Sequence, residues 1–136
     1  MSLFHKLKKE KPHRPLFVLA PMADVTDIAF RTVIQEAGSP DVFWTEFVSA
    51  DGLVRATPEG KAKLMKDLLF DKKQHPIVAQ LFTSNPEHMF QAVTLCRELG
   101  FDGVDINMGC PDKTIEKQKC GSAMIKHPEL AKAVIQ

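Results

Sequence analysis

The stretch PIVAQLFTSNPEHMFQAVTLCRELG, residues 76–100, decides the fold class. Its first part, Ile77–Phe82, is a short apolar run typical of a parallel strand buried on both faces. Asn85–Glu87 (NPE) then offers an N-cap, a proline at the first helical position and an early acid. Gly100 stands where a C-terminal glycine ends a helix. This segment therefore predicts one β-strand followed by one α-helix.

Three further segments have the composition of strands, namely Leu16–Ala20, Val42–Phe47 and Val104–Asn107. Successive strands start about 26 to 34 residues apart, which is the length of one βα unit. Alternating strands and helices predict a parallel sheet with helices packed outside it. One helix is expected after the first strand, with Asp24 or Thr26 as its N-cap and Gly38 at its end. Two more are expected at 49–55 and 58–69. The last predicted helix begins at His127–Glu129 and follows a loop over 108–122.

Two α/β architectures fit this order: a doubly wound open sheet and a (β/α)8 barrel. Eight units at this spacing would need about 240 residues, close to the size of a typical barrel. The chain has 136 residues and four units, and it stops inside the fourth helix.

Composition excludes several classes of protein. The chain is 44% hydrophobic and 26% charged, with a net charge of +1, as in ordinary globular proteins. It contains no apolar run of the roughly 20 residues that a membrane span needs, and no secretory signal. Three cysteines without a CxxC pair favour a reducing, cytoplasmic compartment, and no metal site is expected.

Charge is unevenly placed along the chain. Residues 5–14 carry five Lys and Arg against one Glu, which is 5 − 1 = +4, so the remainder sums to 1 − 4 = −3. Such an arm can contact a polyanion such as RNA. The simpler interpretation, which we favour, is a solvated and disordered terminus over residues 1–14.

Polar residues at the carboxyl ends of the strands are the candidate functional groups, because chemistry in parallel α/β folds takes place there. Gln80 interrupts an apolar strand, and its amide fits either a flat polar ring or neighbouring backbone groups. Glu46, at the end of the second strand, is interpreted as structural. His75 and His88 are expected to face solvent.

The three cysteines differ in their surroundings. Cys110 lies in a Gly-Cys-Pro turn just past a strand, where Gly109 and Pro111 hold the thiol on a rigid turn. A cysteine there can act as a nucleophile or a general acid, although an inert thiol is the simpler interpretation. Cys96 falls in a helix stripe and is expected in the core, whereas the sequence leaves Cys120 undecided.

Four blocks of sequence resemble the tRNA-dihydrouridine synthases. They are LAPMADVTDIAFR (Leu19–Arg31), TEFVSADGL (Thr45–Leu53), PIVAQLF (Pro76–Phe82) and DGVDINMGCPDKTIEKQKCGSAMI (Asp102–Ile125). Their order and spacing make the resemblance specific. It implies a flavoprotein with an N-terminal (β/α)8 TIM barrel and a C-terminal helical RNA-binding domain. Residues 15–136 would then be the N-terminal half of that barrel, the first four units, with the C-terminal half and the helical domain absent.

The resemblance also implies roles for individual residues. The backbone of Pro21, Met22 and Ala23 would contact FMN, and Gln80 would bond its isoalloxazine ring. Asn107 would face the flavin and the uracil, and Cys110 would be the proton donor. The family's flavin-contacting lysine and histidine, and its phosphate-binding loops, belong to later strands.

The implied reaction is the reduction of the C5–C6 double bond of a uridine in tRNA. NADPH would reduce FMN, which passes hydride to C6 while Cys110 protonates C5. Other interpretations are a small-molecule FMN barrel, such as a dihydroorotate dehydrogenase or an ene-reductase, and a non-catalytic half-barrel. We expect the 136 residues alone to bind FMN weakly or not at all, to lack activity as a monomer, and either to aggregate or to self-associate through open barrel edges.

Overall fold

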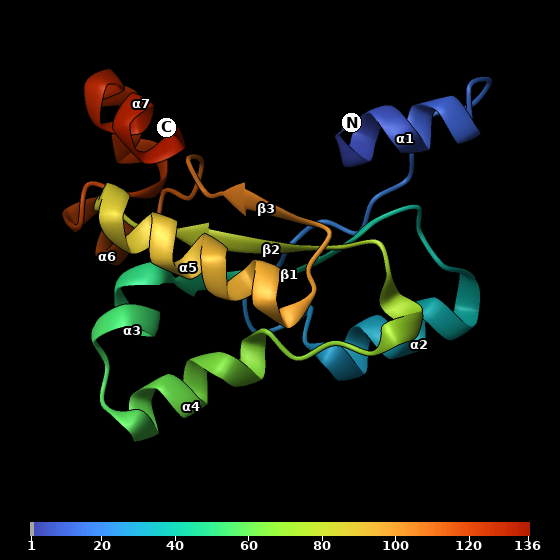
Figure 1. The fold of residues 1–136 in the computed structure, drawn as a ribbon, viewed down its shortest axis with the longest axis horizontal. Coiled ribbons are helices and arrows are strands. Elements are labelled where there is room, and N and C mark those ends of the chain that lie inside the picture. The colour runs from blue at the N-terminus through green and yellow to red at the C-terminus, as the bar shows by residue number, and fades with distance from the viewer. Residues whose placement is uncertain (1) are drawn as a thin grey trace.

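A three-stranded parallel sheet lies at the centre of the computed structural model, which describes residues 2–136. Its strands are β1 (Phe43–Ser49), β2 (Ile77–Phe82) and β3 (Gly103–Ile106), in the order β1-β2-β3 (Figure 1). Helices connect consecutive strands, as the sequence predicts for an α/β fold. The predicted bounds of the central strand agree with β2, and those of its neighbours differ by one or two residues.

Seven α-helices and two 3₁₀-helices accompany the sheet in the described residues. The α-helices are α1 (Leu3–Glu10), α2 (Ile28–Gly38), α3 (Ala50–Arg55), α4 (Pro58–Asp67), α5 (Pro86–Leu99), α6 (Lys113–Lys117) and α7 (Pro128–Ile135). The 3₁₀-helices are η1 (Lys72–Gln74) and η2 (Gly121–Lys126).

The sequence signals around α5 are confirmed. Asn85 accepts hydrogen bonds from the backbone N–H groups of Glu87 and His88, and Gly100 ends the helix with a φ of 92°. The cap predicted for α2 is wrong. Asp27, rather than Asp24 or Thr26, accepts from the N–H of Phe30, so the helix begins at Ile28. The predicted loop over 108–122 contains the short helix α6.

The main core lies between the sheet and α5. All six residues of β2 are buried, and alternate side chains of the strand point to opposite faces of the sheet. Ala79 and Leu81 belong to the cluster that includes Met89, Ala92 and Cys96 of α5. The fully buried Cys96 confirms its prediction as a core residue.

The segment predicted as the first strand does not form a regular strand. Residues 16–20 reach β1 through one isolated parallel bridge, between Val18 and Val42. Phe17 is 63% exposed and Val18 48% exposed, so the expected burial on both faces is also wrong. Two backbone hydrogen bonds flank this bridge, from Leu19 N–H to Val42 O and from Asp41 N–H to Phe17 O, and they are too few for a regular ladder. The predicted four-stranded sheet therefore has three strands and one bridge.

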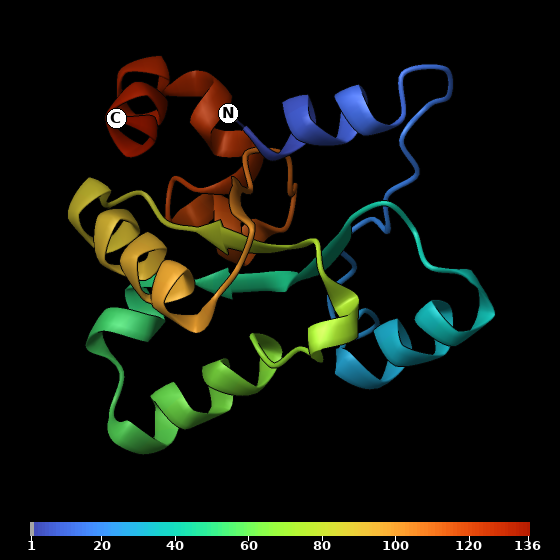
Figure 2. The same cartoon turned by 45° about the vertical axis from the view of Figure 1, so that its right-hand side comes forward.

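The N-terminal segment differs from the disordered arm that the sequence predicts. Residues 3–10 form α1, capped by Ser2, and Leu7 is buried against Val42 and Val78. Figures 1 and 2 show α1 on the opposite side of the sheet from α3 and α4. Lys11 and Arg14, which follow the end of α1, donate hydrogen bonds to the side chain of Asp41. One apolar side chain and two ion pairs therefore order this basic segment.

None of the helices in residues 2–136 has the length and apolar character needed to cross a membrane.

Candidate functional site

A hollow of about 460 Å³ opens at the carboxyl ends of β1, β2 and β3. Its polar lining residues include Gln80, Asp105 and Asn107, and Phe47 and Met108 add apolar surface. The complete lining is Pro21, Ala23, Phe47, Gln80, Asp105, Ile106, Asn107, Met108, Gly109 and Cys110. Five of the six residues proposed from the sequence for cofactor binding or catalysis therefore surround one space. The sixth, Met22, is 40% exposed in the adjoining turn.

Gln80 connects two strands through its side-chain amide. Its Nε2 donates a hydrogen bond to Asp105 Oδ2 at 2.6 Å, and its Oε1 accepts one from Asn107 Nδ2 at 3.2 Å. The sequence left open whether this amide bonds to nearby backbone, and in the structure its partners are two side chains in the hollow. Because a primary amide has two N–H groups and two lone pairs, Gln80 keeps one of each for a ligand.

Asn107 fixes the Gly-Cys-Pro turn. Its Oδ1 accepts hydrogen bonds from the backbone N–H groups of Gly109 at 3.2 Å and Cys110 at 3.0 Å. Such an Asx turn holds the two residues that follow in a defined direction. The same side chain therefore orients both the Gln80 amide and the backbone that carries the Cys110 thiol.

Gly121 supports Cys110 from the other side. Its φ is +59°, and a Cβ atom built on it would lie 2.4 Å from the backbone oxygen of Cys110. The next residue, Ser122, donates its N–H to that oxygen at 2.9 Å. Only glycine allows this approach without strain, because any side chain would collide with the Cys110 carbonyl.

Of the three cysteines, Cys110 is the one that lines the hollow. Cys96 and Cys120 are both 0% exposed, whereas Cys110 is partly exposed and lines the hollow. Burial raises the pKa of the Cys96 thiol to about 11 and also raises the pKa of Cys120, so both remain protonated at neutral pH. Cys120 instead packs with Phe82 and Ile115 beneath the Cys110 loop.

The turn at Pro21–Ala23 is tied to β1 through Glu46. The backbone N–H of Asp24 donates to Glu46 Oε2 at 3.0 Å. Burial raises the pKa of the Glu46 carboxyl. The hydrogen bond from the Asp24 N–H lowers this pKa, and the negative charges of nearby acidic side chains, Asp67 first among them, raise it further. The role of Glu46 in the structure is therefore to hold the turn, in agreement with its structural interpretation.

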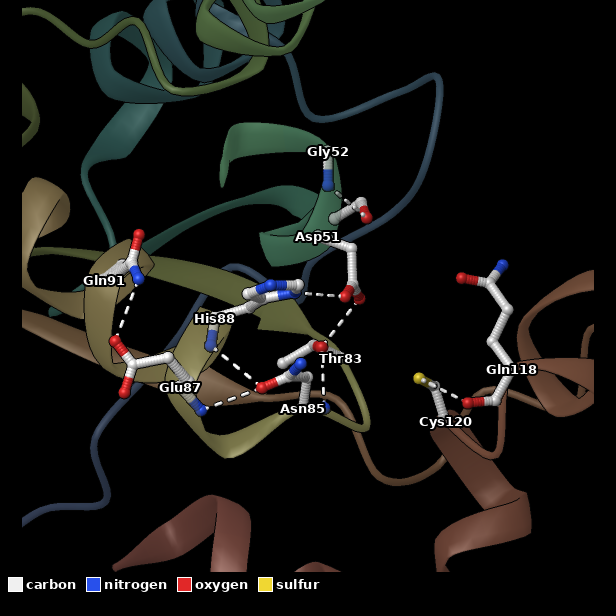
Figure 3. A network of polar contacts seen from close by, with 10 residues as sticks. Asp51, Gly52, Thr83, Asn85, Glu87, His88, Gln91, Gln118 and Cys120 are labelled. Carbon is white, nitrogen blue, oxygen red and sulfur yellow. Dashed lines mark hydrogen bonds and ion pairs between the residues drawn. The ribbon is translucent and has the colours of Figure 1, made fainter. Parts of the chain in front are cut away.

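A second polar cluster lies at the same ends of β1 and β2 (Figure 3). Asp51 of α3 pairs with His88 Nδ1 at 2.6 Å and accepts from Thr83 Oγ1 at 2.6 Å. The His88 side chain is only 14% exposed, so its predicted solvent-facing position is wrong. His75 is 38% exposed and pairs with Asp102 at 2.6 Å. The Asp51 cluster joins α3 to α5 and takes no part in lining the hollow.

This sequence has relatives among known proteins. A sequence model of the dihydrouridine synthase family matches residues 18–136. The chain belongs to the dihydrouridine synthase family. Its relatives include a "Probable tRNA-dihydrouridine synthase 2" of Bacillus subtilis (strain 168), 45% identical over 123 residues. Others are a "Probable tRNA-dihydrouridine synthase" of Staphylococcus aureus (strain Mu50 / ATCC 700699) and one of Staphylococcus epidermidis (strain ATCC 12228 / FDA PCI 1200), each 42% identical over 123 residues.

The match covers most of this chain but only part of each relative. It covers 90% of this chain and 37% of each relative. The chain thus spans little more than a third of the length of the curated relatives it matches.

Two residues in and beside the hollow were not predicted from the sequence. Asp105 lies two residues before Asn107, and that spacing puts both side chains on one face of a strand. The pattern was therefore available to sequence reasoning. Thr45 accepts from the Gln80 N–H at 3.2 Å, and no local signal distinguishes it from any other strand threonine.

Proposed function

We propose that this protein contributes to the FMN-dependent reduction of uridine in tRNA to dihydrouridine, with NADPH as the reductant. The observation that carries the proposal is the convergence of Gln80, Asn107 and Cys110 on one hollow in a chain of this family. The names of the relatives support tRNA as the substrate. We also propose that the three strands and the Val18 bridge are the first four units of a (β/α)8 barrel.

The residues around the hollow fit a flavin ring. The pyrimidine edge of a flavin presents one N–H and two carbonyl groups, and Gln80 retains both a donor and an acceptor beside it. Phe47 and Met108 supply apolar surface of the kind that lines cofactor sites. Gln80 and the backbone of Pro21–Ala23 would hold the ring. When bound and reduced by NADPH, FMN would supply the hydride for C6 of the uracil.

Cys110 holds the proton that completes the reduction. Its thiol would donate that proton to C5 of the uracil as the hydride reaches C6, so the double bond gains two hydrogens. Asn107 fixes the Cys110 amide and keeps the loop in place during this transfer. The target uridine must first leave its stack in the folded tRNA, at a cost of a few kcal/mol.

A chimera tests the proposal. This chain replaces the matched 123-residue segment of the Bacillus subtilis relative, and the product is incubated with FMN, NADPH and tRNA that lacks dihydrouridine. We expect dihydrouridine, detected by mass spectrometry of tRNA digests, with the unaltered relative as the positive control. A folded, flavin-loaded chimera that reduces orotate but leaves tRNA unchanged would refute the proposal.

A further inference from the structure

Arg31 is a buried cation whose hydrogen-bond partners are neutral. Its side chain is 0% exposed within α2. Its Nε donates to Gln74 Oε1 at 3.2 Å, and its two terminal nitrogens donate to the backbone oxygens of Thr26 and Leu69. Burial lowers the pKa of this guanidinium, against the opposing charges of Asp27 and Glu46. A desolvated guanidinium is costly, so an arginine kept here needs all of these acceptors.

Thr26 accepts one of these hydrogen bonds through its backbone oxygen and itself bonds to Met22. It is 0% exposed, and its backbone N–H donates to Met22 O at 3.0 Å. Its hydroxyl accepts from the Met22 N–H at 3.0 Å and donates to Met22 O at 3.1 Å. Both backbone groups of Met22 are therefore held by one residue.

The segment that these bonds constrain borders the hollow. Pro21 and Ala23, on either side of Met22, line it. Glu46 holds the same turn at Asp24, which has a positive φ of 57°. Few non-glycine residues adopt such an angle without supporting contacts. The turn is thus fixed at Met22 by Thr26 and at Asp24 by Glu46.

We infer that Thr26 and Arg31 are positioning residues for a flavin contact: Arg31 locks Thr26, and Thr26 holds the Pro21–Ala23 backbone in the shape that the cofactor meets. Neither residue touches the hollow itself. The inference rests on the proposed function, because it assigns the turn to FMN. Lysine cannot replace Arg31, since one ammonium nitrogen cannot match three acceptors that are arranged around a planar fork.

Backbone amide exchange in the 136-residue chain tests the first half of this inference. Thr26→Val removes the hydroxyl at nearly constant volume, and we expect the Met22 amide to exchange about fivefold faster or more. Thr26→Ser keeps the hydroxyl and should stay within about twofold of the unmodified chain. Thr94→Val is the matched control, because the Thr94 hydroxyl bonds only to Phe90 O in its own helix. Arg31→Lys should accelerate Met22 exchange as well.

Titration with FMN of the same variants, placed in the chimera with the Bacillus subtilis relative, tests the second half, with flavin fluorescence as the readout. We expect Thr26→Val and Arg31→Lys to weaken binding about fivefold or more, and Thr26→Ser to restore it. Unchanged Met22 exchange in Thr26→Val and Arg31→Lys would overturn the inference and leave the proposed function intact. Faster exchange with unchanged FMN affinity would also overturn it. An unmodified chimera that binds no FMN would instead refute the proposed flavin site.

Discussion

The side-chain oxygen of Asn107 holds the backbone amide of Cys110 at 3.0 Å, and the amide nitrogen of the same side chain donates to Gln80. One residue thereby sets the distance between the proposed flavin contact and the proposed proton donor. The arrangement depends on β2 and β3 being adjacent and parallel, because Gln80 pairs in register with Asp105. The site is consequently as rigid as the sheet that carries it.

Replacing Cys110 tests the proposed proton donor. In the chimera, Cys110→Ala should retain flavin while tRNA reduction falls about 100-fold or more, the range expected for loss of a general acid. Cys96→Ala and Cys120→Ala are matched controls, because both thiols are fully buried. Stopped-flow oxidation of the reduced flavin by tRNA measures the step. Normal turnover in Cys110→Ala, or its loss in Cys120→Ala alone, would contradict the assignment.

Replacing Gln80 separates flavin binding from core packing. In the chimera, Gln80→Leu removes both the donor to Asp105 and the acceptor for Asn107, so flavin retention should weaken about tenfold while the protein stays folded. Gln91→Leu is the control, since Gln91 bonds only to Glu87 on the surface of α5. Equilibrium dialysis gives the affinity and circular dichroism the fold. A Gln80→Leu protein that keeps its flavin and melts at a lower temperature would favour a purely structural glutamine.

Gly121 offers a test of the loop geometry beneath Cys110. Gly121→Ala combines an unfavourable positive φ with a collision at the Cys110 carbonyl, so it should cost about 2 kcal/mol or more of unfolding free energy. Gly109→Ala is the control in the same loop, because a Cβ atom added at Gly109 would meet nothing within 4 Å. It should change stability by less than about 0.5 kcal/mol. Urea denaturation measures both, and equal costs would show that the loop is pliable.

Asp41 gives the stability a defined pH dependence. The hydrogen bonds from Arg14 and Lys11 hold the pKa of the Asp41 carboxyl well below its ordinary value of 3.8. A depressed carboxyl pKa stabilises the folded state above the unfolded value, and this contribution is lost as pH falls toward the folded value. Asp41→Asn should therefore lower the melting temperature by about 3–5 °C at pH 7, and this deficit should begin to shrink only as the pH falls below the unfolded value, from about pH 4 downward.

Glu10→Gln is the control for this titration, because Glu10 is exposed on the neighbouring helix α1. Differential scanning calorimetry across the pH range gives the comparison. An Asp41→Asn deficit that does not shrink between pH 7 and pH 2 would show that the carboxylate charge contributes nothing.

Self-association is the expected behaviour of the 136-residue chain. β3 pairs with β2 alone among the described strands, and the Val18 segment has one bridge, so both edges leave backbone groups unpaired. Light scattering after size-exclusion chromatography should show dimers or larger species. Val18→Lys should reduce them, whereas Val33→Lys, on the exposed surface of α2, should not. A monomer that carries flavin and reduces tRNA would contradict this expectation.

Local sequence determined the regular parts of this protein. The bounds of β2 and the caps of α5 follow from an apolar run, an Asn-Pro-Glu start and a final glycine, because these signals act within a few residues of the backbone they shape. The alternation of predicted strands and helices placed Gln80, Asn107 and Cys110 near the carboxyl ends of strands. Their convergence followed from the rule that carboxyl ends of parallel strands share one edge of a sheet.

Tertiary structure decided what depends on partners distant in the chain. The apolar run at 16–20 has the composition of a buried strand, yet it pairs through one bridge only and leaves Phe17 and Val18 exposed. Residues 3–10 form a helix because Leu7 meets Val42 and Val78 and because Asp41 pairs with the cations that follow. Arg31 is held by Gln74 and by the backbone of Leu69, which lie 43 and 38 residues away in the chain. Hydrogen bonds and burial of this kind are long-range, and no local pattern encodes them.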